Sequence, residues 1–325
     1  MDEKKIMTPE EEASLFRFVE DSDARASEKI IAPRYSYWKS VFRVFFKKKI
    51  NIVILVFLAF IIFVAAVMPN FWVYDPFENV TDASTFNLSP KACIEKYGGF
   101  SMKYLFGTGS MGNSILYGIV SSAKTSLVIA TICAAINMFI GIIVGAIWGY
   151  SKKVDKVLLV VYQIIANVPS ILLISVLVYV IGSGFWPFIF ALTVTGWLGI
   201  AFFFRTQVMI IRDREYSLAS RCLGTPILRV ISKNILPFLT SVIVTLLATE
   251  LPSYINMEVF LSYIGVGLSA SVPSLGRMIQ QAQTGFLTYP WEFWPPVSIA
   301  SAITIILYVL GQNLADASDP RTHMM

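Results

Sequence analysis

Six long apolar segments dominate the chain and restrict what it can fold into. They cover residues 50–68, 125–149, 157–181, 187–211, 238–257 and 295–312. A helix needs about 20 mostly apolar residues to cross a bilayer, and each segment is near that length. Only 14% of the 325 residues are charged, whereas about 25% is usual in soluble domains. The sequence therefore predicts an all-α, multi-pass membrane protein with six transmembrane helices.

Basic residues are distributed unevenly among the segments that connect these spans. Of the 26 Lys and Arg residues, 21 lie before the first span, after the last, or near the second and fourth connections. The other five lie in residues 69–124 and 258–294. Cytosolic loops carry an excess of Lys and Arg. We therefore predict that both termini are cytosolic and that 69–124 and 258–294 are external.

The leader, residues 1–49, is predicted to be cytosolic and to end in an amphipathic helix. In residues 36–49 the apolar side chains recur at i, i+3, i+4 and i+7, and basic side chains take the other face. The apolar set is Trp38, Val41, Phe42 and Phe45, and the basic set is Lys39, Arg43 and Lys47. Such a helix lies in the membrane interface, although it could instead pack on a protein partner. Nine acidic residues among the first 50 argue against a nucleic-acid partner.

Residues that could support catalysis, a metal or a nucleotide are scarce. The three cysteines are isolated from one another and the single histidine lies near the C-terminus, a poor basis for a zinc or haem site. These residues are Cys93, Cys133, Cys222 and His323. A GxGxxG at 107–112 lacks the βαβ context of a dinucleotide loop, and no GxxxxGK[ST] phosphate loop is present. We expect no catalytic residue, metal or cofactor in this chain.

A polar segment, residues 212–237, separates the fourth and fifth spans. Gly224 is followed by Thr225–Pro226, and Leu236–Pro237 closes the segment. This spacing resembles the EAA loop of ABC-importer permeases, which reads Glu-Ala-Ala, three residues, Gly, nine residues, Ile, any residue, Leu-Pro. The matching residues are Ala219, Gly224, Leu236 and Pro237, and the family's Glu, second Ala and Ile are replaced by Leu218, Ser220 and Asn234.

Three further stretches extend the resemblance over nearly the whole chain. YLFGTGSMGNSILYGI, before the second span, resembles the FGTDxxGRDxxSR segment of peptide-importer permeases, with Gly109 and Asn113 at the acidic and Arg positions. EVFLSYIGVGLSASVPSLGRMIQ and the terminal GQNLADASDPR resemble two more runs of the same group. The chain thus resembles the C-type membrane subunit of oligopeptide and dipeptide ABC importers, especially the Ami-type oligopeptide permeases of Gram-positive bacteria.

This resemblance implies a type I importer permease fold in the bacterial plasma membrane. Residues 125–312 would form a core of five spans, and 313–325 a cytosolic tail. The implied partners are a second homologous permease, two cytosolic ATPases that bind ATP and Mg, an external peptide-binding lipoprotein and the peptide substrate. The residues expected to couple to the ATPases are Glu215, Ala219, Ser220, Gly224, Thr225, Leu236 and Pro237.

Three polar residues are candidates for the translocation path: Asn167, Glu250 and Glu258. A carboxylate at the membrane midplane costs about 2.5–3.5 kcal/mol on insertion scales. Glu250 therefore either faces a polar path or bonds to a neighbouring helix or to backbone freed by Pro252. Asn167, beside Pro169, interrupts the third span, where proline kinks a helix, and could equally be an interhelical contact. Gly141, Gly145 and Gly149 form overlapping GxxxG units, which predict close helix packing.

Other functions remain to be weighed against peptide import. Dipeptide, nickel and glutathione permeases share the same motifs. A proton-coupled secondary transporter could use Glu250 as its proton carrier, but it would need further buried acidic or histidine residues, and the spans contain almost none. An intramembrane protease would need HExxH, paired membrane aspartates or a Ser–His pair, and His323 is the only histidine.

Overall fold

The computed structural model describes residues 36–269 and 271–319, so most of the 1–49 leader and residues 320–325 of the tail lie outside the described residues. The chain divides into Met1–Ser40 and a large unit, Val41–Met325. Within the described residues the fold is helical, and its one β feature is an isolated bridge between Thr108 and Ser114. The predicted all-α fold is confirmed.

The longest connections between the helices flank α5 (Pro90–Tyr97), and most of the others are short. The first half of the fold contains α3 (Tyr37–Lys47), α4 (Lys49–Val67), α5, α6 (Ile115–Tyr150), α7 (Lys152–Ala166) and α8 (Ser170–Ile181). The second half contains α9 (Phe185–Arg212), α10 (Glu215–Cys222), α11 (Ile227–Arg229), α12 (Thr240–Tyr263), α13 (Leu275–Ala282) and α14 (Pro290–Ser318). A π-helical turn, Val230–Ile235, and a 3₁₀ turn, Leu236–Leu239, join α11 to α12.

Five helical stretches in the described part of the chain are long and apolar enough to cross a membrane: α4, α6, α9, Ile227–Tyr263 and α14. The remaining predicted span, the third, corresponds to the pair α7 and α8, which is bent by 81° at residues 167–169. Pro169 cannot donate a backbone hydrogen bond, and the Asn167 side-chain amide donates to the backbone oxygen of Gln163 at 2.6 Å. The predicted interruption of the third span is therefore a sharp break.

Several span boundaries differ from those predicted. Helix α6 begins at Ile115, inside the segment predicted as loop, because the Ser114 hydroxyl accepts the Tyr117 amide (3.3 Å) and caps the helix. Lys124 interrupts the apolar run, so hydropathy alone does not include this first part of the helix in the predicted span. Helix α14 covers Pro290–Ser318 and so takes in part of the predicted tail. Helix α12 extends to Tyr263 and includes Glu258.

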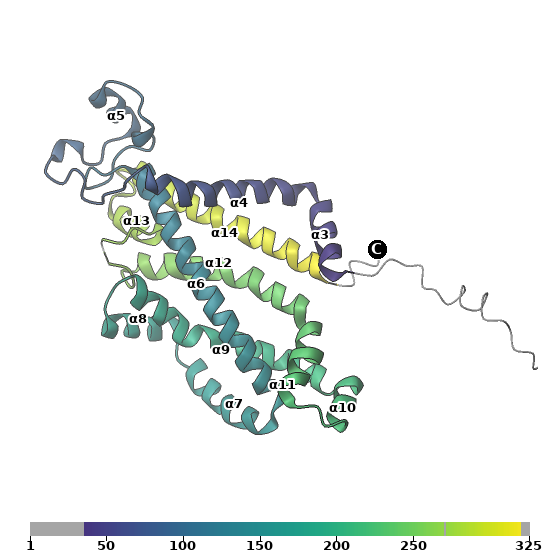
Figure 1. The fold of residues 1–325 in the computed structure, drawn as a ribbon. Coiled ribbons are helices and arrows are strands. Elements are labelled where there is room, and N and C mark those ends of the chain that lie inside the picture. Colours follow the sequence, from purple (N-terminus) through teal and green to yellow (C-terminus); the bar gives the residue numbers. More distant parts are fainter. Residues whose placement is uncertain (1–35, 270, 320–325) are drawn as a thin grey trace, which may run out of the picture. The chain divides into compact units, whose positions relative to one another are not determined.

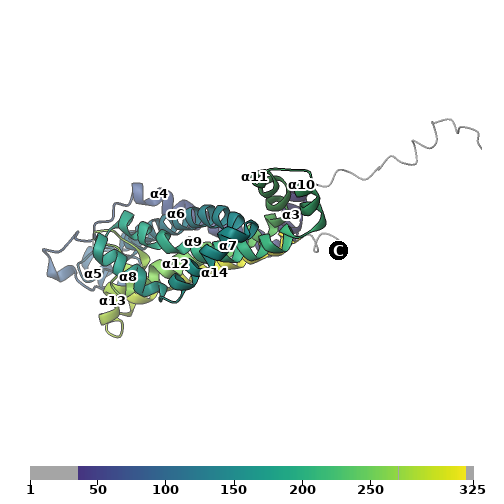
Figure 2. The ribbon, with the colours of Figure 1, turned by 90° about the horizontal axis from the view of Figure 1, so that it is seen from below.

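Helices α6 and α9 approach each other through the predicted GxxxG face. A Cβ atom at Gly145 would lie 2.6 Å from the backbone oxygen of Ala201, and one at Gly149 would lie 2.6 Å from that of Arg205. Small residues permit such backbone contact in lipid. Around this pair, α12 packs against both α6 and α14, and α14 packs against α4 (Figures 1 and 2).

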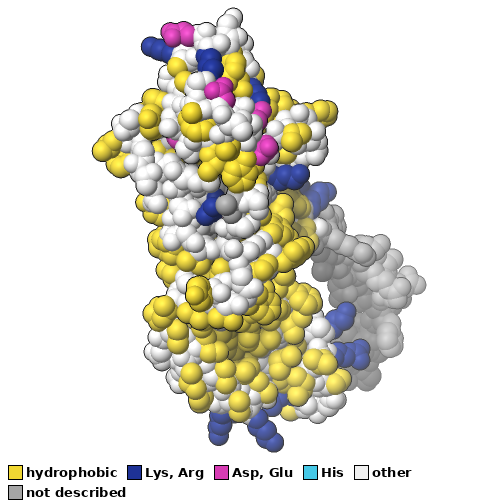
Figure 3. Space-filling model, turned by 90° about the vertical axis from the view of Figure 1, so that its left-hand side faces the viewer, with side chains coloured by type: hydrophobic (Ala, Val, Ile, Leu, Met, Phe, Trp, Pro, Cys, Tyr) yellow, Lys and Arg dark blue, Asp and Glu magenta, His cyan; other side chains and the backbone are white. Residues whose placement is uncertain are grey.

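The helices of the large unit end in two groups of connections. We call residues 71–114 with 264–289 the loop end, and residues 213–235 the α10 end. Acidic side chains gather at the loop end, whereas the helical body is mainly hydrophobic (Figure 3). This distribution fits a body surrounded by lipid and a loop end in water.

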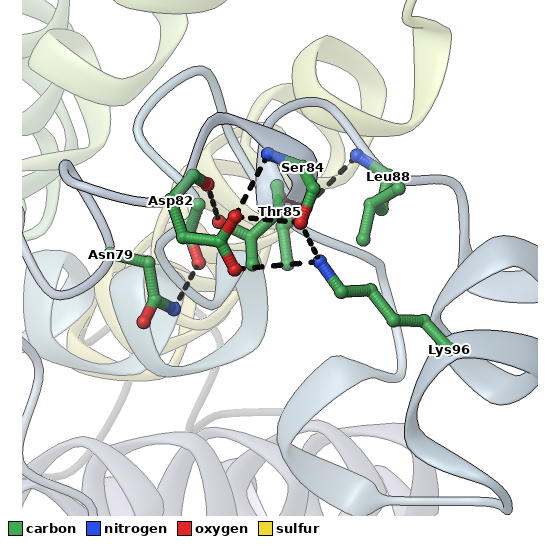
Figure 4. A network of polar contacts seen from close by, with 8 residues as sticks. Asn79, Asp82, Ser84, Thr85, Leu88 and Lys96 are labelled. Atoms are coloured by element: carbon green, nitrogen blue, oxygen red, sulfur yellow. Dashed lines mark hydrogen bonds and ion pairs between the residues drawn. The ribbon is translucent and has the colours of Figure 1, made fainter.

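A polar network holds the loop end together (Figure 4). The Ser84 hydroxyl donates to Asp82 (2.6 Å), and Lys96 donates to the Ser84 hydroxyl (2.5 Å). The Ser84 hydroxyl and amide hold the pKa of the Asp82 carboxyl below its usual value. Thr108, within the GxGxxG, donates to the Thr85 backbone oxygen at 2.6 Å, so this glycine-rich turn serves the folding of the loop.

Candidate functional site

The segment that resembles the EAA loop forms a helical hairpin at the α10 end. Helix α10 ends at Cys222, and Gly224 follows with φ +74°, a left-handed conformation that favours glycine. The Thr225 amide donates to the Ser220 backbone oxygen (3.1 Å), which closes the turn. Pro226 then precedes α11, where proline is well accommodated at a helix start. The glycine thus lets two short helices fold back on each other.

Specific contacts tie this hairpin to the spanning helices. The Asn234 side-chain amide donates to the Ser220 hydroxyl at 2.7 Å. The Tyr216 ring stacks on the Phe238 ring, with the ring centroids 5.1 Å apart. A buried apolar cluster joins the return arm of the hairpin to α6 and α9. Its members are Ala146, Tyr150, Phe204, Val208, Val230, Ile231, Ile235 and Leu239. The hairpin is therefore packed directly against α6 and α9.

The predicted coupling residues are distributed over both sides of the hairpin. Glu215, Ala219, Gly224 and Pro237 are exposed, whereas Ser220, Thr225 and Leu236 are half-buried. The Ser220–Asn234 bond joins two positions at which the sequence departs from the family pattern. Sequence reasoning missed Leu223 and Leu228, whose side chains are 86% and 70% exposed. The one sequence feature that marks them is that each is an apolar residue within a charged segment.

Acidic and basic groups fix the point where α9 enters the hairpin. Arg212 donates to the Gly149 backbone oxygen (2.9 Å) and forms an ion pair with Asp213 (3.0 Å). The hydrogen bond from Arg212 holds the pKa of the Asp213 carboxyl below its usual value. These contacts anchor the last turn of α9 to α6.

A second candidate site is a cavity of about 420 Å³ between α7, α8, α9 and α12. Its lining includes Glu250, Ser253 and Tyr254 of α12, Tyr162 of α7 and the break residue Pro169. The bend between α7 and α8 opens the space, because the two halves do not continue along one axis. The Tyr254 hydroxyl accepts a hydrogen bond from Asn137 of α6 at 2.6 Å, which fixes the tyrosine at the wall.

Of the three predicted path residues, only Glu250 lines this cavity. Glu258 is fully buried and accepts hydrogen bonds from Ser126 (2.7 Å) and Ser262 (2.9 Å), so it joins α12 to α6 near the loop end. Asn167, at the break between α7 and α8, donates back to the Gln163 backbone oxygen of α7. The roles of all three in transport stay predictions. Tyr254 was not predicted, although it follows Glu250 by one helical turn.

Comparison with known proteins places these features in a family. Residues 137–324 match the family described as binding-protein-dependent transport system inner membrane component, and residues 36–90 match the N-terminal TM domain of oligopeptide transport permease C. The chain is 47% identical over 308 residues to the oligopeptide transport system permease protein AmiD of Streptococcus pneumoniae, covering 95% of this chain and 97% of that protein.

Two relatives from Bacillus subtilis are also similar over most of their length. The oligopeptide transport system permease protein OppC is 31% identical over 301 residues, which cover 92% of this chain and 95% of OppC. The dipeptide transport system permease protein DppC is 31% identical over 300 residues, which cover 91% of this chain and 90% of DppC.

Proposed function

Since the chain belongs to the family of binding-protein-dependent transport system inner membrane components, we propose that it moves oligopeptides across the bacterial plasma membrane by alternating access. As a permease subunit of an ABC importer it is not itself an enzyme. The observation that carries the peptide assignment is the 47% identity to AmiD over 95% of the chain. The same assignment would account for the cavity of about 420 Å³, a size typical of ligand sites.

The proposed partners are a second, homologous permease, two cytosolic ATPases and an external peptide-binding lipoprotein. ATP and Mg would be bound by the ATPases, since this sequence has no phosphate loop of the GxxxxGK[ST] type. The α10 hairpin is the docking element that we propose for one ATPase. Its exposed residues include the small Ala219 and Gly224, which allow close approach, and the apolar Leu223, which could enter a groove.

The proposed coupling route begins at the hairpin and ends at the cavity. An ATPase that moves α10 would displace the Ser220–Asn234 and Tyr216–Phe238 contacts, and with them the buried cluster on α6 and α9. Helices α9 and α12 both line the cavity. Shifting them relative to the bent α7–α8 pair would change the side of the membrane to which the cavity opens.

Deleting this chain from its bacterium is expected to abolish uptake of labelled oligopeptides, because one permease subunit cannot form the path alone. Uptake should be measured in washed cells with a pentapeptide, a dipeptide and the corresponding free amino acids. Restoring the gene should restore peptide uptake, and free amino-acid uptake serves as the control. Unchanged uptake of both peptides would contradict the proposed function, whereas loss of dipeptide uptake alone would assign a dipeptide permease.

The orientation that we propose places the loop end outside the cell and the α10 end in the cytosol. An exposed cysteine introduced by Thr81→Cys is expected to react with an impermeant maleimide on intact cells. The natural Cys222 is exposed on α10, while Cys93 and Cys133 are buried. Cys222 lies in the hairpin that we propose as the ATPase docking element, so it supplies an internal control that should react only after lysis and release of the ATPase. Labelling of Cys222 on intact cells, with Thr81→Cys protected, would reverse the orientation.

A further inference from the structure

The Glu250 carboxyl group lines the cavity of α7, α8, α9 and α12 without a partner among the described residues. None of the residues that line the cavity is positively charged. Within the described residues the carboxylate has no hydrogen-bond or ion-pair partner. By contrast, Glu258 on the same helix is satisfied by two serine hydroxyls. Acidic side chains in membrane helices usually face a cavity or pair with another group, and a ligand in this cavity could supply the group that Glu250 lacks.

The surroundings of Glu250 are suited to a peptide backbone. Tyr254 lies one turn further along α12 and also lines the cavity. Its hydroxyl accepts from Asn137, and within the described residues it donates no hydrogen bond. Gly196 and Gly199 of α9 line the same space, and a Cβ atom at Gly199 would meet nothing within 4 Å. The cavity wall therefore offers the Glu250 carboxyl group as an acceptor, the Tyr254 hydroxyl as a donor, and the exposed backbone of the two glycines. Apolar side chains such as Leu173 and Met257 line the same cavity.

We propose that Glu250 binds the ammonium group of the transported peptide and so determines which peptides this permease accepts. The inference rests on the proposed function. A free N-terminus or a lysine side chain can supply the ammonium, and both have the same chemistry toward a carboxylate. The Tyr254 hydroxyl can donate to a peptide carbonyl beside it. Apolar lining residues receive side chains without distinguishing among them, which suits a transporter of varied peptides.

The test compares Glu250→Gln with wild type in cells that contain the complete transporter. The labelled substrates are tetra-alanine, N-acetyl-tetra-alanine and an N-acetylated peptide with one lysine. The external binding protein is the same in both strains, so the variant-to-wild-type ratio for each substrate reports on the permease. Because a hydrogen bond to a charged group contributes substantially to binding, uptake of peptides that bind Glu250 through their ammonium group should fall roughly tenfold or more in the variant. Uptake of N-acetyl-tetra-alanine, which has no ammonium group, should be the same in Glu250→Gln as in wild type.

The substrates separate the two sources of the ammonium. If the N-terminus alone is bound, only tetra-alanine uptake falls in Glu250→Gln. If any ammonium is accepted, uptake of the lysine peptide falls as well. Glu292→Gln, which alters a half-buried carboxylate on α14 outside this cavity, is the matched control and should leave every ratio near one. An equal loss for all substrates, or no loss, overturns the proposal. Failure of wild type to import any peptide would overturn the proposed function itself.

A second measurement avoids the selectivity of the binding protein. In membrane vesicles from cells without that protein, Ser253→Cys places a thiol at the cavity wall, and Cys222→Ser removes the exposed natural thiol. Peptides should slow the reaction of residue 253 with a maleimide. Tetra-alanine should protect at a roughly tenfold lower concentration than its N-acetyl form, and Glu250→Gln should abolish this difference. Equal protection by both peptides in the presence of Glu250 contradicts the proposal.

Discussion

Replacing Gly145 with leucine is expected to prevent α6 from packing on α9. The first atom of the new side chain would lie 2.6 Å from the Ala201 backbone oxygen and 2.9 Å from the Phe204 Cβ atom. A backbone atom cannot turn aside as a flexible side chain can, so the helices must separate. Overpacking of this kind costs up to about 3 kcal/mol, which corresponds to a fall of up to roughly 6–12 °C in melting temperature.

The measurement is the yield and melting temperature of the protein purified in detergent. Gly199→Leu is the matched control, because it makes the same change within a spanning helix where a Cβ atom has open space. Both variants keep the hydropathy needed for insertion, so the comparison isolates packing. A Gly145→Leu protein as stable as Gly199→Leu would mean that α6 and α9 are not in backbone contact.

Much of the architecture follows from local sequence. Apolar length located the spans, and Asn167 with Pro169 located the break in the third, because proline acts on its own helix. Boundaries were less accurate at α6, since Lys124 interrupts the apolar pattern while Ser114 provides the cap. Capping decides where a helix begins, whereas hydropathy reports only the part that contacts lipid.

The cavity could not be predicted in the same way. Its walls come from α7, α8, α9 and α12, and their mutual placement depends on contacts between residues far apart in sequence. Glu250 and Glu258 illustrate the difference. Both are acidic residues near the same apolar segment, but Ser126, 132 residues away, satisfies Glu258 while Glu250 has no such partner. Residue type alone made both of them candidates for the translocation path, whereas the fold shows that only Glu250 lines the cavity.

The α10 hairpin could be predicted from the sequence only in part. The spacing from Gly224 to Leu236–Pro237 identified the segment, because a left-handed glycine followed by a returning helix is a local arrangement. It did not reveal that Leu223 would be the most exposed apolar side chain of the hairpin. Exposure depends on which face of the hairpin the buried cluster covers, and that cluster includes residues from α6 and α9.

Leu223→Glu is expected to uncouple the permease from its ATPase while leaving the chain folded. The side chain is 86% exposed, so the change removes little contact within the chain. If Leu223 is buried in an ATPase groove, as we propose, its loss removes about 1.5–3 kcal/mol of apolar burial and adds a carboxylate without a partner. ATPase recovered with the tagged permease should therefore fall by roughly tenfold or more, and peptide uptake should fall with it.

Leu287→Glu is the control that distinguishes docking from a general effect of added charge. Leu287 is 83% exposed and lies at the loop end, between α13 and α14, so the same substitution occurs far along the chain from the hairpin. It should leave ATPase co-purification unchanged. Because Leu223 touches so little of its own chain, a loss specific to Leu223→Glu at normal yield can only come from a partner surface. Wild-type recovery of the ATPase with Leu223→Glu would exclude this face of the hairpin from the interface.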